Sequence, residues 1–373
     1  MPMRQGTLRP ILILLVALTL AACAQRGQIT LSESAPEGAT VHSIFVATSR
    51  VPTTGPTRFG SKRAEALRHA LYDISVPPNH EKGQIEWPRG NRVDPDFAFV
   101  TTSEMALTGP DFTRRLDRHL DGLAPSSREV VVFVHGFNNT YAEGLYRLAQ
   151  ITHDFEIPGA AVSYAWPSAG NPLGYVYDRD STVTARDGLE QLLHQVAETR
   201  TDRILIVAHS MGSFLTMEAL RQAAIRDRAS PLWRKISGVV LLSPDIDVDV
   251  FRSQARAIGV LPQPFFIFTS RRDRALMLSA GLTGRVTRLG SLDDLDALAD
   301  LNVTVVDTTQ VRGGDGLGHF TTATSPAAIA VLGNLRAYQL ALNADQAGAA
   351  NVLPGSVRLF RNVTQVVLNP LGL

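Results

Sequence analysis

Short apolar runs alternate with segments of helical periodicity along most of the chain from Glu129 onward. Six runs have the length and the Val, Ile and Phe content of buried strands, at 129–134, 160–166, 203–208, 238–243, 264–269 and 302–307. Helical patterns lie between or after them, at 140–154, 180–199, 211–228, 247–257, 291–299 and 325–342. Because apolar strands alternate with helices, the pattern predicts an α/β protein with a mostly parallel central sheet and helices on both faces.

The part of the chain before Glu129 follows a different pattern. Three short β-type runs, at 43–48, 71–76 and 96–100, are separated by turns rich in proline and glycine and predict an edge region. Residues 24 to about 40 are small and polar without periodicity, so 23–41 is interpreted as a flexible tether. We therefore expect the folded domain at 42–345.

The closing residues, 346–373, are expected to be a tail. Apolar side chains at Val357, Phe360, Val363 and Val367 have the spacing of a short amphipathic helix, which would pack against the domain or make a second membrane contact. About 20 residues separate the runs 238–243 and 264–269. That connection is too short for a large inserted cap domain, so the chain is expected to have none.

The first 22 residues have the features of a sorting signal. Arg4 and Arg9 precede an apolar run from Ile11 to Leu20 that is too short to span a bilayer. The sequence LAAC at 20–23 resembles the lipobox of bacterial lipoproteins, which implies that Cys23 is acylated and holds the protein on a membrane. An ordinary secretory signal cut near Ala22 is the alternative.

The resemblance to a lipoprotein also implies a location. Ala24 stands where the inner-membrane retention signal of this class carries an aspartate, so the expected place is the bacterial cell envelope, at the outer membrane facing the periplasm. Cys23 is the only cysteine of the chain, which excludes an intramolecular disulfide.

Composition narrows the class of partner. The chain of 373 residues has 36 basic and 35 acidic side chains, so no overall field would attract nucleic acid. The glycines of GGDGLG at 313–318 lack the spacing of a dinucleotide site, and DIDVD at 245–249 lacks the later glycine and glutamate of a calcium loop. We expect no cofactor and no metal ion.

The strongest local signal for chemistry is AHSMG at 208–212, directly after an apolar strand and before a helix. A serine on a sharp strand-to-helix turn is exposed as a nucleophile, and small flanking residues such as Ala208 and Gly212 allow that turn. Ala208 departs from the glycine usual at that position. The alternative is that Ser210 merely caps the helix.

A histidine lies where a general base would be expected. His319 is in the glycine-rich segment GGDGLGHF, after the last predicted strand and before the last predicted helix. A base needs a pKa near the working pH, which histidine supplies. The alternative is an ordinary solvated loop histidine.

A third group must orient that histidine. Asp273, which follows the strand 264–269, has the expected position, although it would also suit a salt bridge to Arg271, Arg272 or Arg274. Asp245 and Asp247, after the strand 238–243, are the alternative acids.

Several strings occur together in a distinctive order: FVATSR (45–50), FVHGFNNT (133–140), YAWPSAG (164–170), YVYDRD (175–180), AHSMG, LLSPDID (241–247), SRRDRAL (270–276) and GHF (318–320). From about His42 to about Leu342 the chain resembles the bacterial α/β-hydrolases of unknown function within the esterase and lipase superfamily. The resemblance implies the α/β-hydrolase fold and a triad of Ser210, Asp273 and His319.

The same resemblance assigns roles around the serine. The backbone amides of Phe137 and Met211 would form an oxyanion hole. Four further residues would support the elbow and the loop before it, with a structural role favoured for the first of them: His135, Gly136, His209 and Gly212.

The function expected from these features is a serine hydrolase, specifically a carboxylesterase that forms an acyl-enzyme on Ser210. Its substrate would be a small-molecule or lipid ester, bound in an open cleft where Trp166, Tyr175 and Tyr177 either offer stacking surface or are packed. A non-catalytic envelope binding protein on the same scaffold and an acyltransferase with the same triad are the alternatives.

Overall fold

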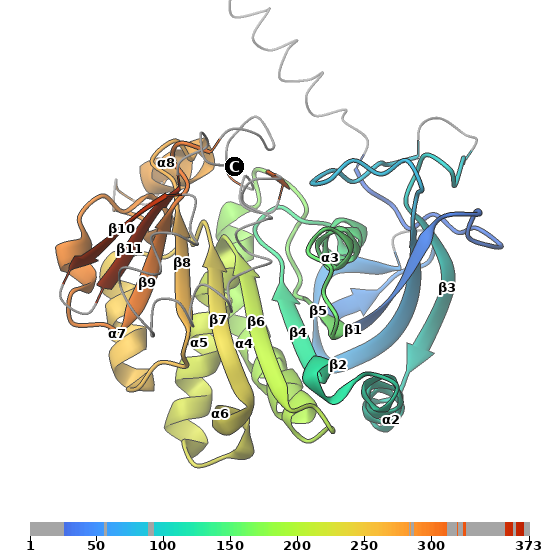
Figure 1. Cartoon of the computed structure of the whole chain (residues 1–373), viewed down its shortest axis with the longest axis horizontal. Coiled ribbons are helices and arrows are strands. Elements are labelled where there is room, and N and C mark those ends of the chain that lie inside the picture. The colour runs from blue at the N-terminus through green and yellow to red at the C-terminus, as the bar shows by residue number, and fades with distance from the viewer. Residues whose placement is uncertain are drawn as a thin grey trace, which may run out of the picture.

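The computed structural model describes residues 26–55, 58–88, 93–282, 284, 287–311, 319, 324–325, 355–360 and 363–368. Eleven strands form one sheet in the order β10-β11-β9-β8-β7-β6-β4-β5-β1-β2-β3 (Figure 1). Their bounds are Thr40–Pro52 (β1), Phe59–Val76 (β2), Val100–Leu107 (β3), Glu129–Val134 (β4), Ala160–Ala165 (β5), Arg203–His209 (β6), Ile236–Leu242 (β7), Phe265–Thr269 (β8), Val303–Asp307 (β9), Gly355–Phe360 (β10) and Val363–Leu368 (β11).

The centre of the sheet is parallel. Neighbouring strands from β1 through β5, β4, β6, β7, β8 and β9 to β11 pair in parallel, while β2, β3 and β10 add antiparallel pairs at the two sides. Parallel strands need crossover connections, and helices supply them. The sheet therefore has all the carboxyl ends of its central strands along one edge.

Helices cover both faces of this sheet (Figure 1). They are α2 (Gly109–Asp121), α3 (Tyr141–Asp154), α4 (Tyr175–Ala197), α5 (Met211–Asp227), α6 (Pro231–Lys235), α7 (Val248–Ile258) and α8 (Arg274–Leu282), with short 3₁₀ turns at Pro125–Ser127, Leu289–Ser291 and Leu295–Leu298. The larger core joins α2, α4, α5 and α7 to one face, and the other core packs α3 against the opposite face.

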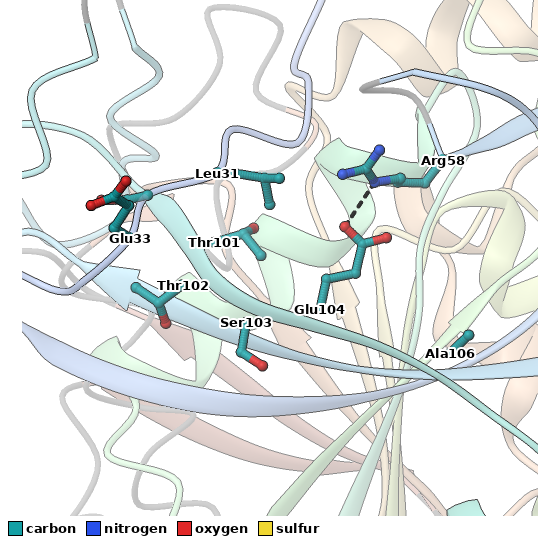
Figure 2. Close-up of a pocket in the computed structure, with 9 residues that line it drawn as sticks. Leu31, Glu33, Arg58, Thr101, Thr102, Ser103, Glu104 and Ala106 are labelled. Carbon is teal, nitrogen blue, oxygen red and sulfur yellow. Dashed lines mark hydrogen bonds and ion pairs between the residues drawn. The ribbon is translucent and has the colours of Figure 1, made fainter.

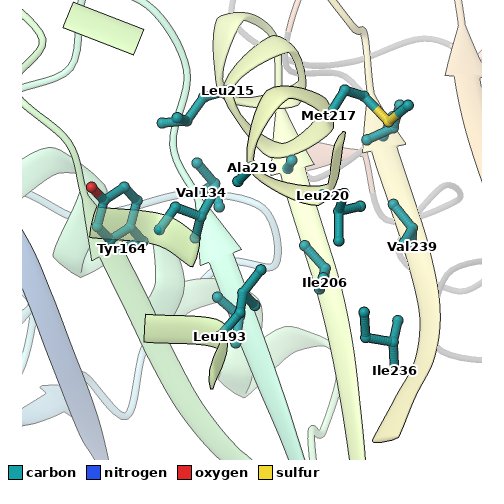
Figure 3. Close-up of a cluster of buried hydrophobic side chains, with 14 of the residues drawn as sticks. Val134, Tyr164, Leu193, Ile206, Leu215, Met217, Ala219, Leu220, Ile236 and Val239 are labelled. Atoms are coloured by element: carbon teal, nitrogen blue, oxygen red, sulfur yellow. The ribbon is translucent and has the colours of Figure 1, made fainter. Parts of the chain in front are cut away.

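Alternation along the strands explains the two cores. On β4, Val130, Val132 and Val134 face the larger core, whereas Phe133 faces α3. Figure 3 shows part of the larger core, where Val134 and Ile206 from the sheet meet Leu215 and Leu220 of α5. These side chains are fully buried, and their removal from water is the main force that holds helix against sheet.

The segment 26–39, interpreted from sequence as part of a tether, contacts the domain in the structure. Arg26 forms an ion pair with Glu143, at the start of α3, and Ile29 is buried. Leu31 pairs with Thr101 of β3 in an isolated bridge, beside a shallow pocket of about 700 Å³. Figure 2 shows this pocket with Leu31 beside β3. The polar sequence thus packs through a few specific contacts that periodicity does not signal.

The six predicted strands after residue 129 are confirmed as β4 to β9, and four predicted helices as α3, α4, α5 and α7. The run 96–100 is misplaced, because β3 begins at Val100 and continues through polar, partly exposed residues. At 291–299 the structure has 3₁₀ turns instead of one helix. The predicted helix 325–342 lies outside the described residues, except at 325. The signal segment and Cys23 also lie outside them.

The prediction of an amphipathic helix in the closing residues is wrong. Gly355–Phe360 and Val363–Leu368 are the antiparallel strands β10 and β11, and β11 pairs in parallel with β9. Val363, Val366 and Leu368 are buried. The β-branched valines suit a strand at this position, and the exposed backbone edge of β9 supplies its hydrogen-bonding partner.

Among the described residues, none of the helices has both the length and the apolar character needed to cross a bilayer.

A largely buried ion cluster joins the loop after β2 to the end of α3. The Nδ1 and Nε2 atoms of His80 lie 2.9 Å from Glu86 Oε2 and 2.8 Å from Asp154 Oδ1, so both nitrogens donate to carboxylates. Burial alone lowers the pKa of His80, but the bonds and charges of Asp154 and Glu86 outweigh it and raise the pKa to about 9. The imidazole of His153 lies against His80, and its pKa is lowered by burial and by the charge of His80.

Replacing His80 is therefore expected to destabilise the fold in a pH-dependent way. The His80→Gln variant leaves the buried Asp154 and the partly exposed Glu86 without their cation, at a cost of about 3 kcal/mol near pH 6. Because the pKa of His80 is raised on folding from 6.5 to about 9, its contribution is complete below pH 6.5 and is lost as the pH rises through 9. Thermal unfolding across this range checks the prediction.

The matched control is His119→Gln. Burial lowers the pKa of His119, so any loss of stability in this variant should not diminish between pH 6.5 and 9. A stability difference for His80→Gln that stays constant over the same range would contradict the charged cluster.

Candidate active site

The turn after β6 holds Ser210 in a strained backbone conformation. Ser210 has φ 52° and ψ −123°, values that residues with side chains rarely adopt. Hydrogen bonds fix the turn, because the Ser210 amide donates to Leu242 O at 2.9 Å and the Ser210 carbonyl accepts from the amides of Ser213 and Asp245. The turn is therefore tied both to β7 and to the start of α5.

Two glycines allow this turn to touch the loop after β4. A Cβ atom on Gly212 would lie 2.3 Å from the carbonyl oxygen of His135, and one on Gly136 would lie 2.6 Å from His209 Nδ1 and 2.9 Å from Ser210 Cβ. Any side chain at either position would push the two segments apart. The loop that begins at His135 is thus in direct contact with the serine turn.

The structure brings Asp273 and His319 together. His319 Nδ1 lies 2.7 Å from Asp273 Oδ2, and Asp273 is fully buried while the His319 side chain is 14% exposed. Asp273 Oδ1 also accepts the amide of Leu276 at the start of α8, which fixes the carboxylate. In this arrangement Nδ1 carries the hydrogen and the lone pair of the imidazole is on Nε2.

His209 connects this pair to the serine turn. Its ring packs against the ring of His319 with centroids 4.7 Å apart, and its Nε2 donates to the His319 carbonyl oxygen at 3.3 Å. Burial, and secondarily the charge of His319, keeps the pKa of His209 well below its usual value. A neutral His209 next to Ser210 therefore helps to position the backbone of His319, a role that its place in AHSMG did not reveal.

The alternative acids have other partners. Asp245 accepts hydrogen bonds from Tyr175 Oη and Ser279 Oγ and forms a buried ion pair with Arg288 at 3.2 Å. Asp247 caps α7 by accepting the amide of Val250. Of the predicted acids, Asp273 is the one whose carboxylate contacts His319.

The ring of His135 is held by an aromatic neighbour and by backbone carbonyl groups. Its ring stacks on Trp166 with centroids 5.0 Å apart, and its Nδ1 and Nε2 atoms lie 3.0 and 3.1 Å from the carbonyl oxygens of Gly136 and Trp166. Burial lowers the pKa of His135 to about 3, with a further contribution from Arg50, so the ring stays neutral. The structural role expected for His135 from sequence stays a prediction, and these contacts support it.

A buried aspartate holds the loop 137–139 from α4. Asp178 Oδ2 accepts the Asn138 amide at 3.1 Å and the Ser168 hydroxyl at 2.6 Å, and Oδ1 accepts the Ala169 amide at 2.6 Å. Ser168 Oγ in turn accepts the amide of Asn139. Burial raises the pKa of Asp178 in spite of these bonds.

A buried arginine at the end of β1 holds the same loop from another side. Arg50 donates to the carbonyl oxygens of Gly60, Ser168 and Asn139 at 3.1, 3.1 and 2.9 Å. Burial lowers its pKa to about 10, and the charge of Asp178 opposes that change. Sequence reasoning assigned no role to Arg50 or Asp178, although both are in the distinctive strings, FVATSR and YVYDRD.

The aromatic residues proposed for the cleft wall are packed. Trp166 is fully buried against His135, and Tyr175 is 8% exposed with its hydroxyl on Asp245. Tyr177 donates to the Ser61 carbonyl oxygen under the guanidinium of Arg63. The 700 Å³ pocket at β3 contains none of the predicted site residues.

The Asp178 network predicts a measurable change in the loop. The Asp178→Asn variant replaces one carboxylate oxygen by an NH₂ group. That group is a donor, so it cannot accept the hydrogen bonds that Asp178 receives from the loop amides and the Ser168 hydroxyl. We expect roughly tenfold faster amide hydrogen exchange at residues 137–139. Exchange measured by mass spectrometry checks this.

Asp180→Asn is the matched control, because Asp180 is exposed on the same helix. In the Asp180→Asn variant, the amide hydrogens of residues 137–139 should exchange at the wild-type rate. Equal exchange rates at 137–139 in Asp178→Asn and wild type would show that the aspartate does not hold the loop.

Comparisons with known proteins agree with this architecture. The model of the family described as alpha/beta hydrolases of unknown function (DUF900) matches residues 111–336. An uncharacterized protein, alr1448, of Nostoc sp. (strain PCC 7120 / SAG 25.82 / UTEX 2576) is 38% identical over 64 residues, and the match spans 17% of either chain.

Solved structures are more distant. A putative hydrolase from Agrobacterium vitis S4 is 13% identical, with 80% of this chain and 98% of that chain covered and a TM-score of 0.35. Esterase B from Lactobacillus rhamnosis (HN001) is 12% identical, with 89% and 93% covered and a TM-score of 0.38. The family match covers more than half of the chain, and the chain therefore belongs to the alpha/beta hydrolases of unknown function.

Proposed function

We propose that this protein is a serine hydrolase, specifically a carboxylesterase in which Ser210 is the nucleophile, His319 the general base and Asp273 the orienting acid. The observation that carries the proposal is the hydrogen bond of 2.7 Å between His319 Nδ1 and Asp273 Oδ2, beside the strained turn of Ser210. That bond leaves the lone pair of His319 on Nε2, which is the atom that takes a proton from a serine hydroxyl.

The reaction proceeds in two halves. Ser210 Oγ attacks the ester carbonyl carbon while its proton passes to His319 Nε2, and the tetrahedral intermediate then releases the alcohol, which takes that proton from His319. Water attacks the acyl-serine in the second half while His319 Nε2 takes its proton. The carboxylic acid then leaves as Ser210 Oγ receives that proton from His319. Asp273 holds the imidazole in place and stabilises the imidazolium in both halves.

The oxyanion would be stabilised by the amides of Phe137 and Met211. Two observations support this assignment. Neither amide donates a hydrogen bond to another group in the described part of the chain, and the close approach of Gly136 to Ser210 holds the loop next to the nucleophile. Asp178 and Arg50 act as positioning residues, because they fix Asn138 and Asn139 directly after Phe137.

We also propose that the protein is a lipoprotein of the bacterial envelope, acylated at Cys23 and held at the outer membrane facing the periplasm. The support is the sequence LAAC at 20–23 after an apolar run. Incorporation of radioactive palmitate into the wild type but not into the Cys23→Ala variant is the expected result, and equal incorporation into both would contradict it.

Labelling with a fluorophosphonate probe tests the triad. Wild type should label, Ser210→Ala should not, and His319→Ala and Asp273→Asn should label slower by a factor on the order of 10³ or more, because the serine loses its base or the base loses its orientation. Gel fluorescence over a time course gives the rates.

Two neighbouring residues provide controls. Ser213→Ala removes a buried hydroxyl three residues away that donates to the Ala208 carbonyl, and Asp247→Asn alters the cap of α7. Both variants should label at nearly the wild-type rate. Folded wild-type protein that does not label would overturn the proposal and favour the binding scaffold.

A further inference from the structure

Four large apolar side chains are exposed at the carboxyl edge of the sheet. Leu173 and Val176, which follow β5, are 92% and 74% exposed, and Met277 and Leu278, which follow β8, are 60% and 68% exposed. We call these four residues the apolar rim. Exposed apolar side chains that gather on one face of a protein mark interaction sites more often than scattered ones do.

The two halves of the rim lie on either side of the serine turn. Tyr175 lies between Leu173 and Val176 in the sequence, and its hydroxyl donates to Asp245 Oδ2 at 3.0 Å. The hydroxyl of Ser279, which follows Leu278, donates to Asp245 Oδ1 at 2.7 Å. The amide of Asp245 donates to the Ser210 carbonyl oxygen. One buried aspartate thus connects the nucleophile's backbone to both apolar pairs.

Positive charges lie next to the α8 half of the rim. Three exposed arginines surround the start of α8, namely Arg271, Arg272 and Arg274. Arg271 lies 3.5 Å from exposed Asp293. Apolar side chains together with arginines suit a membrane interface, where the former enter the acyl region and the latter meet anionic headgroups.

The chain enters the domain at this same edge. Arg26 donates to the carbonyl oxygen and the side-chain oxygen of Asn138, in the loop after β4, at 2.6 and 2.8 Å. Cys23 is three residues earlier in the sequence. Three residues span at most about 11 Å, so an anchor at Cys23 would hold the loop 137–139 and the rim close to the bilayer.

We propose that the face around Ser210 docks on the lipid bilayer through the apolar rim and that the substrate is an ester of a membrane lipid. The part of this inference that concerns the substrate rests on the proposed hydrolase function. The part that concerns docking rests on the surface geometry alone. Figure 1 shows α8 at the edge where β8 ends, which is the edge that would face the membrane.

A fluorophore at the rim tests docking directly. Because Cys23 is the only cysteine, the full chain with Cys23→Ala accepts a single label at Leu278→Cys. An environment-sensitive dye there should shift to shorter wavelength when vesicles of phosphatidylethanolamine and phosphatidylglycerol are added.

Ile225→Cys provides the matched control, since Ile225 is 64% exposed near the end of α5, at the opposite edge of the sheet. Its dye should keep the spectrum of the vesicle-free protein. No shift at position 278, or an equal shift at 225, would overturn the docking surface whatever the protein's activity.

Turnover tests the substrate class. In the Cys23→Ala background, the Met277→Ser, Leu278→Ser double variant should lower the ratio of vesicle-lipid hydrolysis to p-nitrophenyl acetate hydrolysis by about tenfold. The variant with Ile225→Ser and Val260→Ser, also exposed apolar residues, should keep the wild-type ratio.

The two hypotheses fail differently. Wild-type protein that cleaves p-nitrophenyl acetate but no vesicle lipid would overturn the lipid substrate and leave the hydrolase intact. Protein that cleaves neither ester would overturn the proposed function, and with it the substrate inference.

Discussion

The close contact between the loop after β4 and the turn after β6 is the constraint on which the site depends. Parallel pairing of β4 with β6, from Glu129–Arg203 to Val134–Ala208, brings the ends of the two strands side by side. Gly212 and Gly136 then let the backbones approach to distances that a Cβ atom would forbid. Phe137 and Met211 come from these two segments, so the geometry proposed for the oxyanion hole follows from strand register and two missing side chains.

Buried charge maintains this contact. Arg50 and Asp178 are both taken out of water, which is costly, and their hydrogen bonds go mainly to backbone groups of the loops after β4 and β5. A loop of glycine, asparagine and serine has little apolar surface with which to fix itself. The polar network supplies that order, at the place where a hydrolase would need preorganised donors.

The sequence predicts the central fold well because each element there has a strong local pattern. The strands β4 to β9 are apolar runs, and α3, α5 and α7 begin at or directly after polar or turn residues that halt the strand pattern. The elements at the edges of the sheet are harder to predict from sequence. Helix α2 is polar except for Phe112, Leu116 and Leu120. The segment of β11 is a strand because it pairs with β9, and a local sequence pattern does not contain that long-range contact.

The candidate site was predictable to the extent that its residues follow strands. Ser210, Asp273 and His319 each come after an apolar run, so parallel topology alone places them at one edge. Asp273 and Asp245 both follow neighbouring strands, so the sequence alone could not show which of the two carboxylates contacts His319. Their distinction comes from tertiary contacts with His319 and with Arg288. Arg50 and the ring of His209 donate hydrogen bonds to backbone carbonyl oxygens. The spacing of side chains along the sequence does not predict such contacts.

The proposed function requires Ser210 to form a covalent intermediate with an ester substrate. Mixing the protein with p-nitrophenyl acetate, quenching in acid within the first turnover and mapping peptides by mass spectrometry tests this most directly. The wild type is expected to carry an added acetyl group on Ser210. Ester hydrolysis with the acetyl group on another residue, or with none on the protein, would contradict it.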